Sequence, residues 1–149
     1  MKVCLRSALY PAFLQGGIEA LYTPLMISRL GYCEYNCTLC GQVCPTGAIP
    51  ELPVERKKLE VIGKAVFDKN HCIPWADGKT CLVCQELCPV PDKAILIDTA
   101  DVKAPNGAVV KLGRPQVIAE RCIGCGVCEN ACPVAYQPAI VVYATQPRS

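Results

Sequence analysis

Residues 122–133 read Cys-Ile-Gly-Cys-Gly-Val-Cys-Glu-Asn-Ala-Cys-Pro, and they carry the strongest signal in the chain. The four cysteines are separated by two, two and three residues, and a proline follows the last one. A loop with this spacing can wrap three thiolates around one [4Fe-4S] cluster, while the fourth cysteine of such a run ligates a second cluster. The stretch therefore predicts an iron-sulfur site and a matching group of cysteines elsewhere in the chain.

Two further groups of cysteines precede this one. Twelve of the 13 cysteines fall into three groups of four, and each group ends in Cys-x-x-x-Cys-Pro. The first, second and third groups are Cys33, Cys37, Cys40 and Cys44; Cys72, Cys81, Cys84 and Cys88; and Cys122, Cys125, Cys128 and Cys132. Soft thiolate ligands in this number are typical of iron-sulfur sites. The groups predict three [4Fe-4S] clusters and an electron carrier that passes single electrons between redox partners.

The proline after each fourth cysteine predicts how the second and third groups share ligands. Proline fixes the exit of the loop, so the fourth cysteine points away from its own loop and toward the neighbouring cluster. We expect one cluster to be held by Cys72, Cys81, Cys84 and Cys132, and another by Cys122, Cys125, Cys128 and Cys88. Eight residues separate Cys72 from Cys81. We interpret them as a loop beside the cluster, in which Trp75 either packs or contacts a partner.

The first group leaves two ligand sets open. Met1-Lys2-Val3-Cys4 has the form of the tail of a cysteine loop, because three residues before a cysteine is the usual last gap. We expect Cys33, Cys37 and Cys40 to take Cys4 as a remote fourth ligand, which leaves Cys44 free. The alternative is a self-contained site in which Cys44 is the fourth ligand. A fourth cluster would need ligands from outside this chain, and the sequence leaves open whether Met1 is the natural start.

Composition argues against several other classes. The 149 residues carry a net charge of +2 without a basic stripe beyond Arg56-Lys57-Lys58, so we expect no nucleic-acid partner. We read that short run as a solvated linker or a docking patch. Only 6% of residues are aromatic and 19% charged. The clusters must then supply much of the cohesion, and loss of metal predicts loss of fold.

The hydrophobic fraction of 52% does not indicate a membrane span, because prolines and charges interrupt every apolar stretch. No secretory or twin-arginine signal is recognisable, which favours a cytoplasmic location. Leu14, Ile18, Leu21 and Leu25 have helical spacing, so we expect a short or bent helix there that packs against a cluster lobe.

From about residue 59 the pattern becomes regular and predicts an α+β fold. Strands are expected at 59–67, 94–97, 109–112, 115–119 and 139–143, and short helices at 83–87 and 126–131. The succession of strand, cysteine loop, helix and strand occurs twice, which predicts a ferredoxin-like lobe with pseudo-twofold symmetry. We therefore expect a two-cluster domain at 59–149, preceded by a smaller lobe at 1–58 that binds one cluster.

Three alternatives compete with electron transfer. Zinc is a common metal in cysteine-rich chains, but structural zinc sites usually place two close pairs of cysteines on separate knuckles. A cluster-based redox sensor would need an effector domain, and none is visible. An enzyme is disfavoured because His71, the only histidine, adjoins a predicted ligand, and no acid-base pair or phosphate loop is present. The aspartates Asp68, Asp77 and Asp92 are read as turn residues.

Several motifs around the cysteines resemble polyferredoxins of the MauM/NapG type. They are Gly31-Tyr32-Cys33-Glu34-Tyr35-Asn36-Cys37, Cys40-Gly41-Gln42-Val43-Cys44-Pro45, Asn70-His71-Cys72-Ile73-Pro74-Trp75 and Cys88-Pro89-Val90-Pro91-Asp92. The resemblance extends over nearly the whole chain and implies electron transfer between a membrane quinol-oxidising partner and a downstream oxidoreductase. It also implies a periplasmic or membrane-associated location, although the usual twin-arginine signal and most of the first cysteine loop are missing here.

Overall fold

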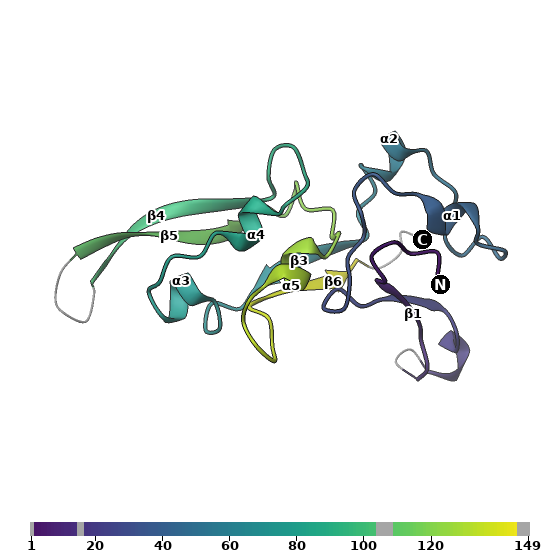
Figure 1. The fold of residues 1–149 in the computed structure, drawn as a ribbon, viewed down its shortest axis with the longest axis horizontal. Helices are drawn as coiled ribbons and strands as arrows, with labels where there is room; N and C mark the ends of the chain where they lie inside the picture. Colours follow the sequence, from purple (N-terminus) through teal and green to yellow (C-terminus); the bar gives the residue numbers. More distant parts are fainter. Residues whose placement is uncertain (1, 15–16, 104–108, 146–149) are drawn as a thin grey trace.

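The computed structural model describes residues 2–14, 17–103 and 109–145. Short helices and strands alternate along the chain and are joined by the loops that carry the cysteines (Figure 1). In chain order they are β1 (Leu9–Pro11), the 3-10 helix η1 (Ile18–Ala20), β2 (Pro24–Met26), α1 (Leu39–Gln42), α2 (Val54–Lys57), β3 (Gly63–Phe67), α3 (Ile73–Ala76), α4 (Val83–Glu86), β4 (Ile95–Lys103), β5 (Val109–Val117), α5 (Val127–Ala131) and β6 (Ile140–Ala144). The predicted mixture of helix and strand is confirmed.

The described strands form antiparallel pairs, and one pair brackets the second and third cysteine groups. Strand β3 pairs with β6, with Gly63 opposite Ala144 and Phe67 opposite Ile140. Both strands lie close to their predicted positions, although β3 begins at Gly63 rather than at residue 59. Because the first strand of this region bonds to its last, the loops between them are held at one site.

Strands β4 and β5 form a long ribbon that extends away from the body (Figure 1). The register runs from Ile95 opposite Val117 to Lys103 opposite Val109. The prediction of two separate short strands at 109–112 and 115–119 was wrong. Pro115 lies inside β5, because each strand of a two-stranded ribbon has one unpaired edge, where a residue without an N–H group is tolerated.

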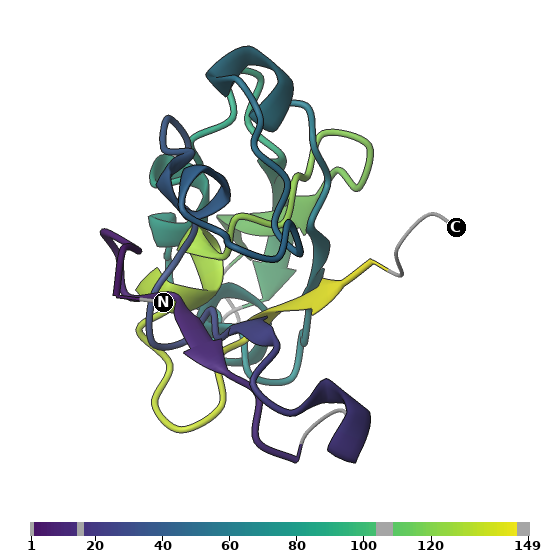
Figure 2. The same cartoon turned by 90° about the vertical axis from the view of Figure 1, so that its right-hand side faces the viewer.

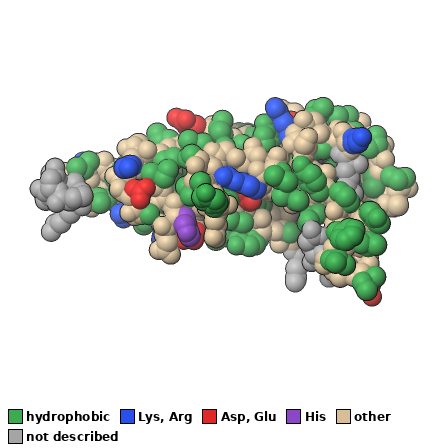
Figure 3. All heavy atoms as spheres, turned by 60° about the horizontal axis from the view of Figure 1, so that its bottom comes forward, with side chains coloured by type: hydrophobic (Ala, Val, Ile, Leu, Met, Phe, Trp, Pro, Cys, Tyr) green, Lys and Arg blue, Asp and Glu red, His purple; other side chains and the backbone are tan. Residues whose placement is uncertain are grey.

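The predicted N-terminal helix is also wrong. Strands β1 and β2 form a small hairpin, with the single turn η1 between them. The part around η1 projects from the body in both views (Figures 1 and 2). Its hydrophobic side chains are exposed, including Phe13, Ile18 and Tyr22. Figure 3 shows hydrophobic side chains gathered at the right-hand end of the molecule. Gly17 and Pro24 explain the difference, because neither residue continues a helix.

The segment between Cys72 and Cys81 contains a helix that the sequence interpretation missed. Helix α3 begins at Ile73, directly after Cys72. Pro74 stands in its first turn, where proline needs no N–H partner and its backbone is already set for a helix. The insertion is therefore partly ordered and covers the second cysteine group.

The core is small and consists largely of cysteines. Of the 14 buried hydrophobic residues in the described ranges, six are cysteines of the second and third groups. Ile95 and Ile140 are the largest fully buried side chains apart from Pro74. Ala65 and Ala94 belong to the same group of buried hydrophobic residues. The apolar packing thus surrounds the thiols themselves.

One arginine fastens the N-terminal region to the rest. The Arg29 guanidinium donates hydrogen bonds to the carbonyl oxygens of Glu129 at 3.1 Å, Cys132 at 2.9 Å and Val134 at 2.9 Å. Asn130 returns a hydrogen bond to the Arg29 carbonyl at 3.1 Å. The chain before the first cysteine group is therefore held against the end of α5.

Candidate metal centres

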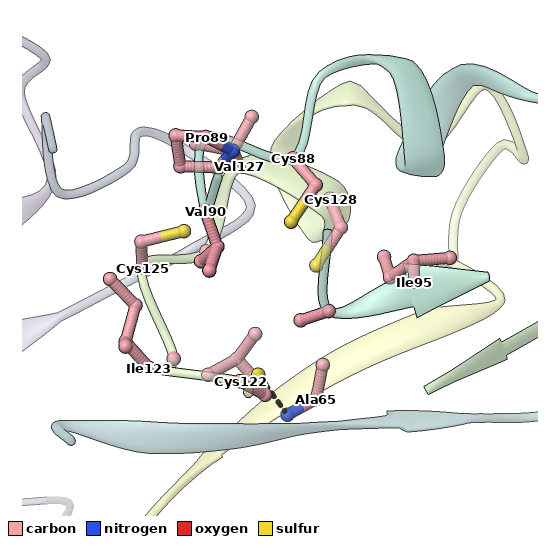
Figure 4. Close-up of a pocket in the computed structure, with 14 residues that line it drawn as sticks. Ala65, Cys88, Pro89, Val90, Ile95, Cys122, Ile123, Cys125, Val127 and Cys128 are labelled. Carbon is pink, nitrogen blue, oxygen red and sulfur yellow. Dashed lines mark hydrogen bonds between the residues drawn. The ribbon is translucent and has the colours of Figure 1, made fainter. Parts of the chain in front are cut away.

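A cavity in the C-terminal region gathers cysteines from two groups. Cys122, Cys125 and Cys128 line it together with Cys88, which is 34 residues before Cys122 in the sequence. Their sulfur atoms face the same space (Figure 4). With its open mouth the cavity encloses about 340 Å³ that no atom occupies. We call it the third-group cavity.

The remaining wall of this cavity is apolar. Ala65, Val90, Ile95 and Val142 contribute to the lining. The Ala65 amide donates a hydrogen bond to the Cys122 sulfur at 3.4 Å (Figure 4). Four thiols, an apolar wall and a backbone N–H aimed at sulfur are the features that hold an iron-sulfur cluster and raise its potential.

A second cavity of about 330 Å³ repeats this arrangement with the groups exchanged. Cys72, Cys81 and Cys84 line it together with Cys132 from the end of the third group. Phe67, Ile73 and Pro115 supply apolar walls. We call it the second-group cavity. The grouping is the one that the sequence pattern predicts, and the roles of these cysteines as ligands stay a prediction.

Burial disfavours ionisation of the thiols in the two cavities. Burial raises the pKa of Cys72 and of Cys125 to about 11 and that of Cys84 to about 12, and it holds the pKa of Cys128 well above its usual range. A bound metal ion deprotonates a coordinating thiol because its positive charge offsets this cost. The donor set therefore fits an iron-sulfur cluster, and loading would release protons.

Glycines with left-handed backbone shape the loop of the third group. Gly124 has a φ of +76° and Gly126 a φ of +83°. A Cβ atom on Gly124 would overlap the backbone of Gly63 at the start of β3, and one on Gly126 would lie 2.7 Å from the Ser28 hydroxyl. Only glycine allows the loop to turn here while strand β3 and the segment around Ser28 approach so closely.

The first group also brings three thiols together. Burial raises the pKa of Cys33, the ammonium of Lys57 lowers it, and charges on Cys40 and Cys37 raise it. Cys33, Cys37 and Cys40 lie on one short loop, in which the Cys37 amide donates to the Glu34 carbonyl at 3.2 Å and which leads into α1. All three are half-buried, so this group is more open to solvent than the third.

The two candidates for the fourth ligand of this group differ in their surroundings. The Cys4 sulfur accepts the Ala8 amide at 3.3 Å. Its neighbour Arg6 forms an ion pair with Glu34 at 2.9 Å and stacks over the Tyr32 ring at 5.1 Å. The turn that carries Cys4 is thereby attached to the loop of the first group.

Cys44 lies in a separate turn that favours its ionised form. The Ile49 amide donates to its sulfur at 3.4 Å, and the Thr46 hydroxyl lies 3.7 Å away. These hydrogen bonds lower the pKa of Cys44 to about 7, and the one from Ile49 has the largest effect. A substantial fraction of Cys44 would therefore be thiolate at neutral pH even without metal.

A lysine caps the loop carbonyls of each cysteine group, which the sequence interpretation missed. Lys93 donates to the Cys88 carbonyl at 2.7 Å, and Lys64 to the Cys122 carbonyl at 2.8 Å. Lys57 donates to the carbonyls of Glu34 and Tyr35, the latter at 3.1 Å. The reading of 56–58 as a solvated linker was therefore wrong for Lys57. No sequence motif marks these lysines, because their partners are backbone carbonyls.

The remaining singled-out residues have local roles. The Trp75 indole N–H donates to the Pro115 carbonyl at 3.2 Å, and its ring lies between Lys69 and Arg114, at 4.4 and 4.6 Å. Trp75 thus packs against β5. The exposed His71 bonds to Asp68 at 2.6 Å, and this hydrogen bond lowers the pKa of Asp68.

The described residues form neither a single-ion metal site nor a membrane-spanning helix. No group of three or more Cys, His, Asp or Glu side chains there is arranged to bind a single metal ion. A single ion needs its ligands around one point, whereas a cube accepts them at four corners. Nor does any helix in those ranges have the length and apolar character that crossing a bilayer requires.

Comparison with known proteins agrees with these features. Residues 115–135 match the family described as the 4Fe-4S binding domain. The chain is 31% identical to the methylamine utilization ferredoxin-type protein MauM of Methylorubrum extorquens over 135 residues, which cover 87% of this chain and 58% of the relative. No solved structure matches it.

Relatives named NapG show the same degree of similarity. Identity to the ferredoxin-type protein NapG of Escherichia coli is 34% over 146 residues, covering 95% of this chain and 60% of the relative. Identity to NapG of Haemophilus influenzae is 32%, covering 89% of this chain and 46% of the relative. The chain thus spans about half of the length of these relatives. The predicted resemblance to both kinds of protein is confirmed.

Proposed function

We propose that this chain, which is similar to the ferredoxin-type proteins MauM and NapG, is an iron-sulfur protein that relays single electrons through three [4Fe-4S] clusters. The observation that carries the proposal is the exchange of cysteines between the two cavities. Cys88 joins the third group and Cys132 joins the second. This exchange is how paired clusters share ligands in two-cluster ferredoxins.

In this proposal the second-group cavity binds one cluster through Cys72, Cys81, Cys84 and Cys132. The third-group cavity binds another through Cys122, Cys125, Cys128 and Cys88. The pairing of β3 with β6 and of β4 with β5 supports a pseudo-twofold lobe over 59–149. When bound, each cluster accepts and gives up one electron, and the chain supplies ligands, an apolar wall and N–H groups directed at sulfur.

The first cluster is proposed to be held by Cys33, Cys37, Cys40 and Cys4 in the region 1–58. The ion pair between Arg6 and Glu34 supports this choice, because it attaches the turn of Cys4 to the loop of the first group. Replacing Cys4 and Cys44 separately by serine tests it. Only Cys4→Ser should remove a cluster, and equal iron content in the two variants would refute the assignment.

The partners are proposed to be redox proteins rather than small substrates. A larger oxidoreductase on one side and a membrane quinol-oxidising subunit on the other fit an electron carrier of the MauM/NapG kind. The chain itself is proposed to catalyse no substrate reaction, since its described cavities are lined by thiols and apolar side chains.

Metal analysis of protein purified without oxygen tests the function. We expect about 12 iron atoms and as many labile sulfides per chain, and an EPR signal after reduction with dithionite. Zinc in place of iron, or disulfides without labile sulfide, would overturn the proposal. About 16 iron atoms would indicate a fourth cluster with ligands from elsewhere.

A further inference from the structure

Building on the proposed function, we propose that the clusters form a row whose order in space differs from their order in the sequence. The third group holds the middle cluster. The first and second groups hold the two ends, and electrons enter and leave there. The order is therefore first, third, second, although the second group lies between the others in the chain.

Direct contact joins the first group to the third. The Cys33 amide donates a hydrogen bond to the Cys125 carbonyl at 2.8 Å. Cys33 is a predicted ligand of the first cluster, and Cys125 is a predicted ligand of the third. The chain just before Cys33 lies along the same loop, because Ser28 approaches Gly126 so closely that a Cβ there would touch its hydroxyl. The two sites are thus separated by little more than one peptide group.

On its other side the third group adjoins the second. Cys128 lies on α5 and Cys84 on α4, and these two helices pack against each other. Each of the two cavities also takes one cysteine from the other group, Cys88 in one and Cys132 in the other, so the two sites are adjacent. The third group is therefore in contact with both of the others.

The arrangement along the molecule agrees with these contacts. Along the longest axis, α1 lies toward one end and α3 toward the other, with α5 between them (Figure 1). Helix α1 carries Cys40 and α3 follows directly on Cys72. The first and second groups therefore lie on opposite sides of the third.

Burial distinguishes the middle from the ends. The four cysteines that line the third-group cavity are each at most 9% exposed. The first-group cysteines Cys33, Cys37 and Cys40 are half-buried instead. In the second-group cavity Cys72 and Cys84 are buried, but Cys81 and Cys132 are half-buried, so this site is enclosed on one side only. Because electron transfer slows steeply with distance, a partner at the surface exchanges electrons faster with an end cluster than with the enclosed middle one.

Single serine variants that each remove one cluster test the order. Reduced clusters that are neighbours show spin-spin broadening in EPR, whereas distant ones give narrow, additive signals. The decisive variant is Cys81→Ser, which removes the second cluster at a half-buried ligand. Its two remaining clusters, first and third, should still be broadened by their interaction. The matched control Cys37→Ser removes the first cluster and should leave the coupled pair of the second and third.

Cys122→Ser gives an independent measurement if Cys81→Ser fails to fold. It removes the middle cluster, so the two that remain should give narrow signals. Iron analysis identifies which variants hold about eight iron atoms and are therefore informative. Narrow signals from Cys81→Ser, or broadened ones from Cys122→Ser, would overturn the order. Absence of iron from the unmodified protein would instead refute the proposed function.

Discussion

Lys57 places a positive charge beside the first cysteine group. Its ammonium bonds to the carbonyls of Glu34 and Tyr35 and, after burial, has the largest effect on the pKa of Cys33, which it lowers. A nearby cation stabilises the reduced cluster, because reduction adds negative charge. For Lys57→Gln we expect the midpoint potential of one cluster to become more negative by tens of mV, since about 59 mV corresponds to a tenfold change in a one-electron equilibrium. An EPR-monitored redox titration measures it.

Lys58 is the matched control for this change. Its ammonium lies over the same Tyr35 ring at 5.3 Å, but the charge effects on Cys33 come from Lys57 and not from Lys58. Lys58→Gln should leave all potentials within a few mV of the unmodified protein, because Lys58, although as buried as Lys57, donates no hydrogen bond to the loop of the first group. Equal shifts in both variants would mean that net charge rather than the contact sets the potential.

Cys44 offers a test of ligand assignment that needs no mutation. If Cys4 completes the first cluster, Cys44 is the free thiol of a loaded protein, and hydrogen bonds hold its pKa at about 7. Alkylation by iodoacetamide requires the thiolate, so its rate should rise as the pH increases through about 7 and level off above it. Mass spectrometry of anaerobic, cluster-loaded protein should find the label on Cys44.

The label on Cys4 would contradict this assignment. It would show that Cys44 serves as the ligand and that Cys4 is free. A rate that rises only near the pKa of an ordinary thiol, about 8.5, would instead show that the hydrogen bonds from Ile49 and Thr46 do not stabilise the thiolate.

At the scale of the elements, the loop of the third group depends on its contact with β3. Gly124 combines a left-handed φ of +76° with a close approach to the backbone of Gly63. For Gly124→Ala we expect a loss of about 3 kcal/mol or more, because strain and a clash with backbone atoms add. The variant should lose the cluster of this cavity, measured as iron per chain and as the temperature at which visible absorption bleaches.

Gly78 provides a control with the same backbone geometry and no clash. Its φ is +64°, and a Cβ there would meet nothing within 4 Å. Gly78→Ala should therefore cost only about 1 kcal/mol of backbone strain and keep its iron. If both variants lose iron equally, the left-handed conformation rather than the approach to β3 is what the loop needs.

The elements also show how far the sequence could be interpreted. The helices at α4 and α5 and the strands β3 and β6 are found within a few residues of their predicted positions, because the cysteine loops fix where they begin and end. The helix predicted from the spacing around Ile18 did not form. The Ile18 side chain is 83% exposed, so the described structure offers no surface there that would bury a helix. Spacing could group the cysteines but could not find Lys57 or Arg29. Their partners are backbone carbonyls, which every residue has.

At the scale of the whole molecule, the part of the chain that the structure describes buries few apolar side chains other than cysteines. Six of the 14 buried hydrophobic residues in the described ranges are cysteines that line the two cavities. If these cavities hold clusters, emptying them removes both the metal bonds and the atoms against which Ile95 and Ile140 pack. Removal of iron by a chelator under reducing, oxygen-free conditions should then abolish the far-UV circular dichroism of the folded chain and increase its hydrodynamic radius.

A control must show that the loss of structure comes from removal of iron and not from the reductant or the chelator itself. The control is the same chelator saturated with iron beforehand, which should leave absorption and circular dichroism unchanged. Adding iron and sulfide back to the apoprotein should restore both, since ligand formation and folding are one process in small metal-held domains. An apoprotein that keeps its circular dichroism and unfolds cooperatively on heating would mean that the apolar contacts around Ile95 and Ile140 hold the fold without metal. The cysteines would then serve electron transfer alone.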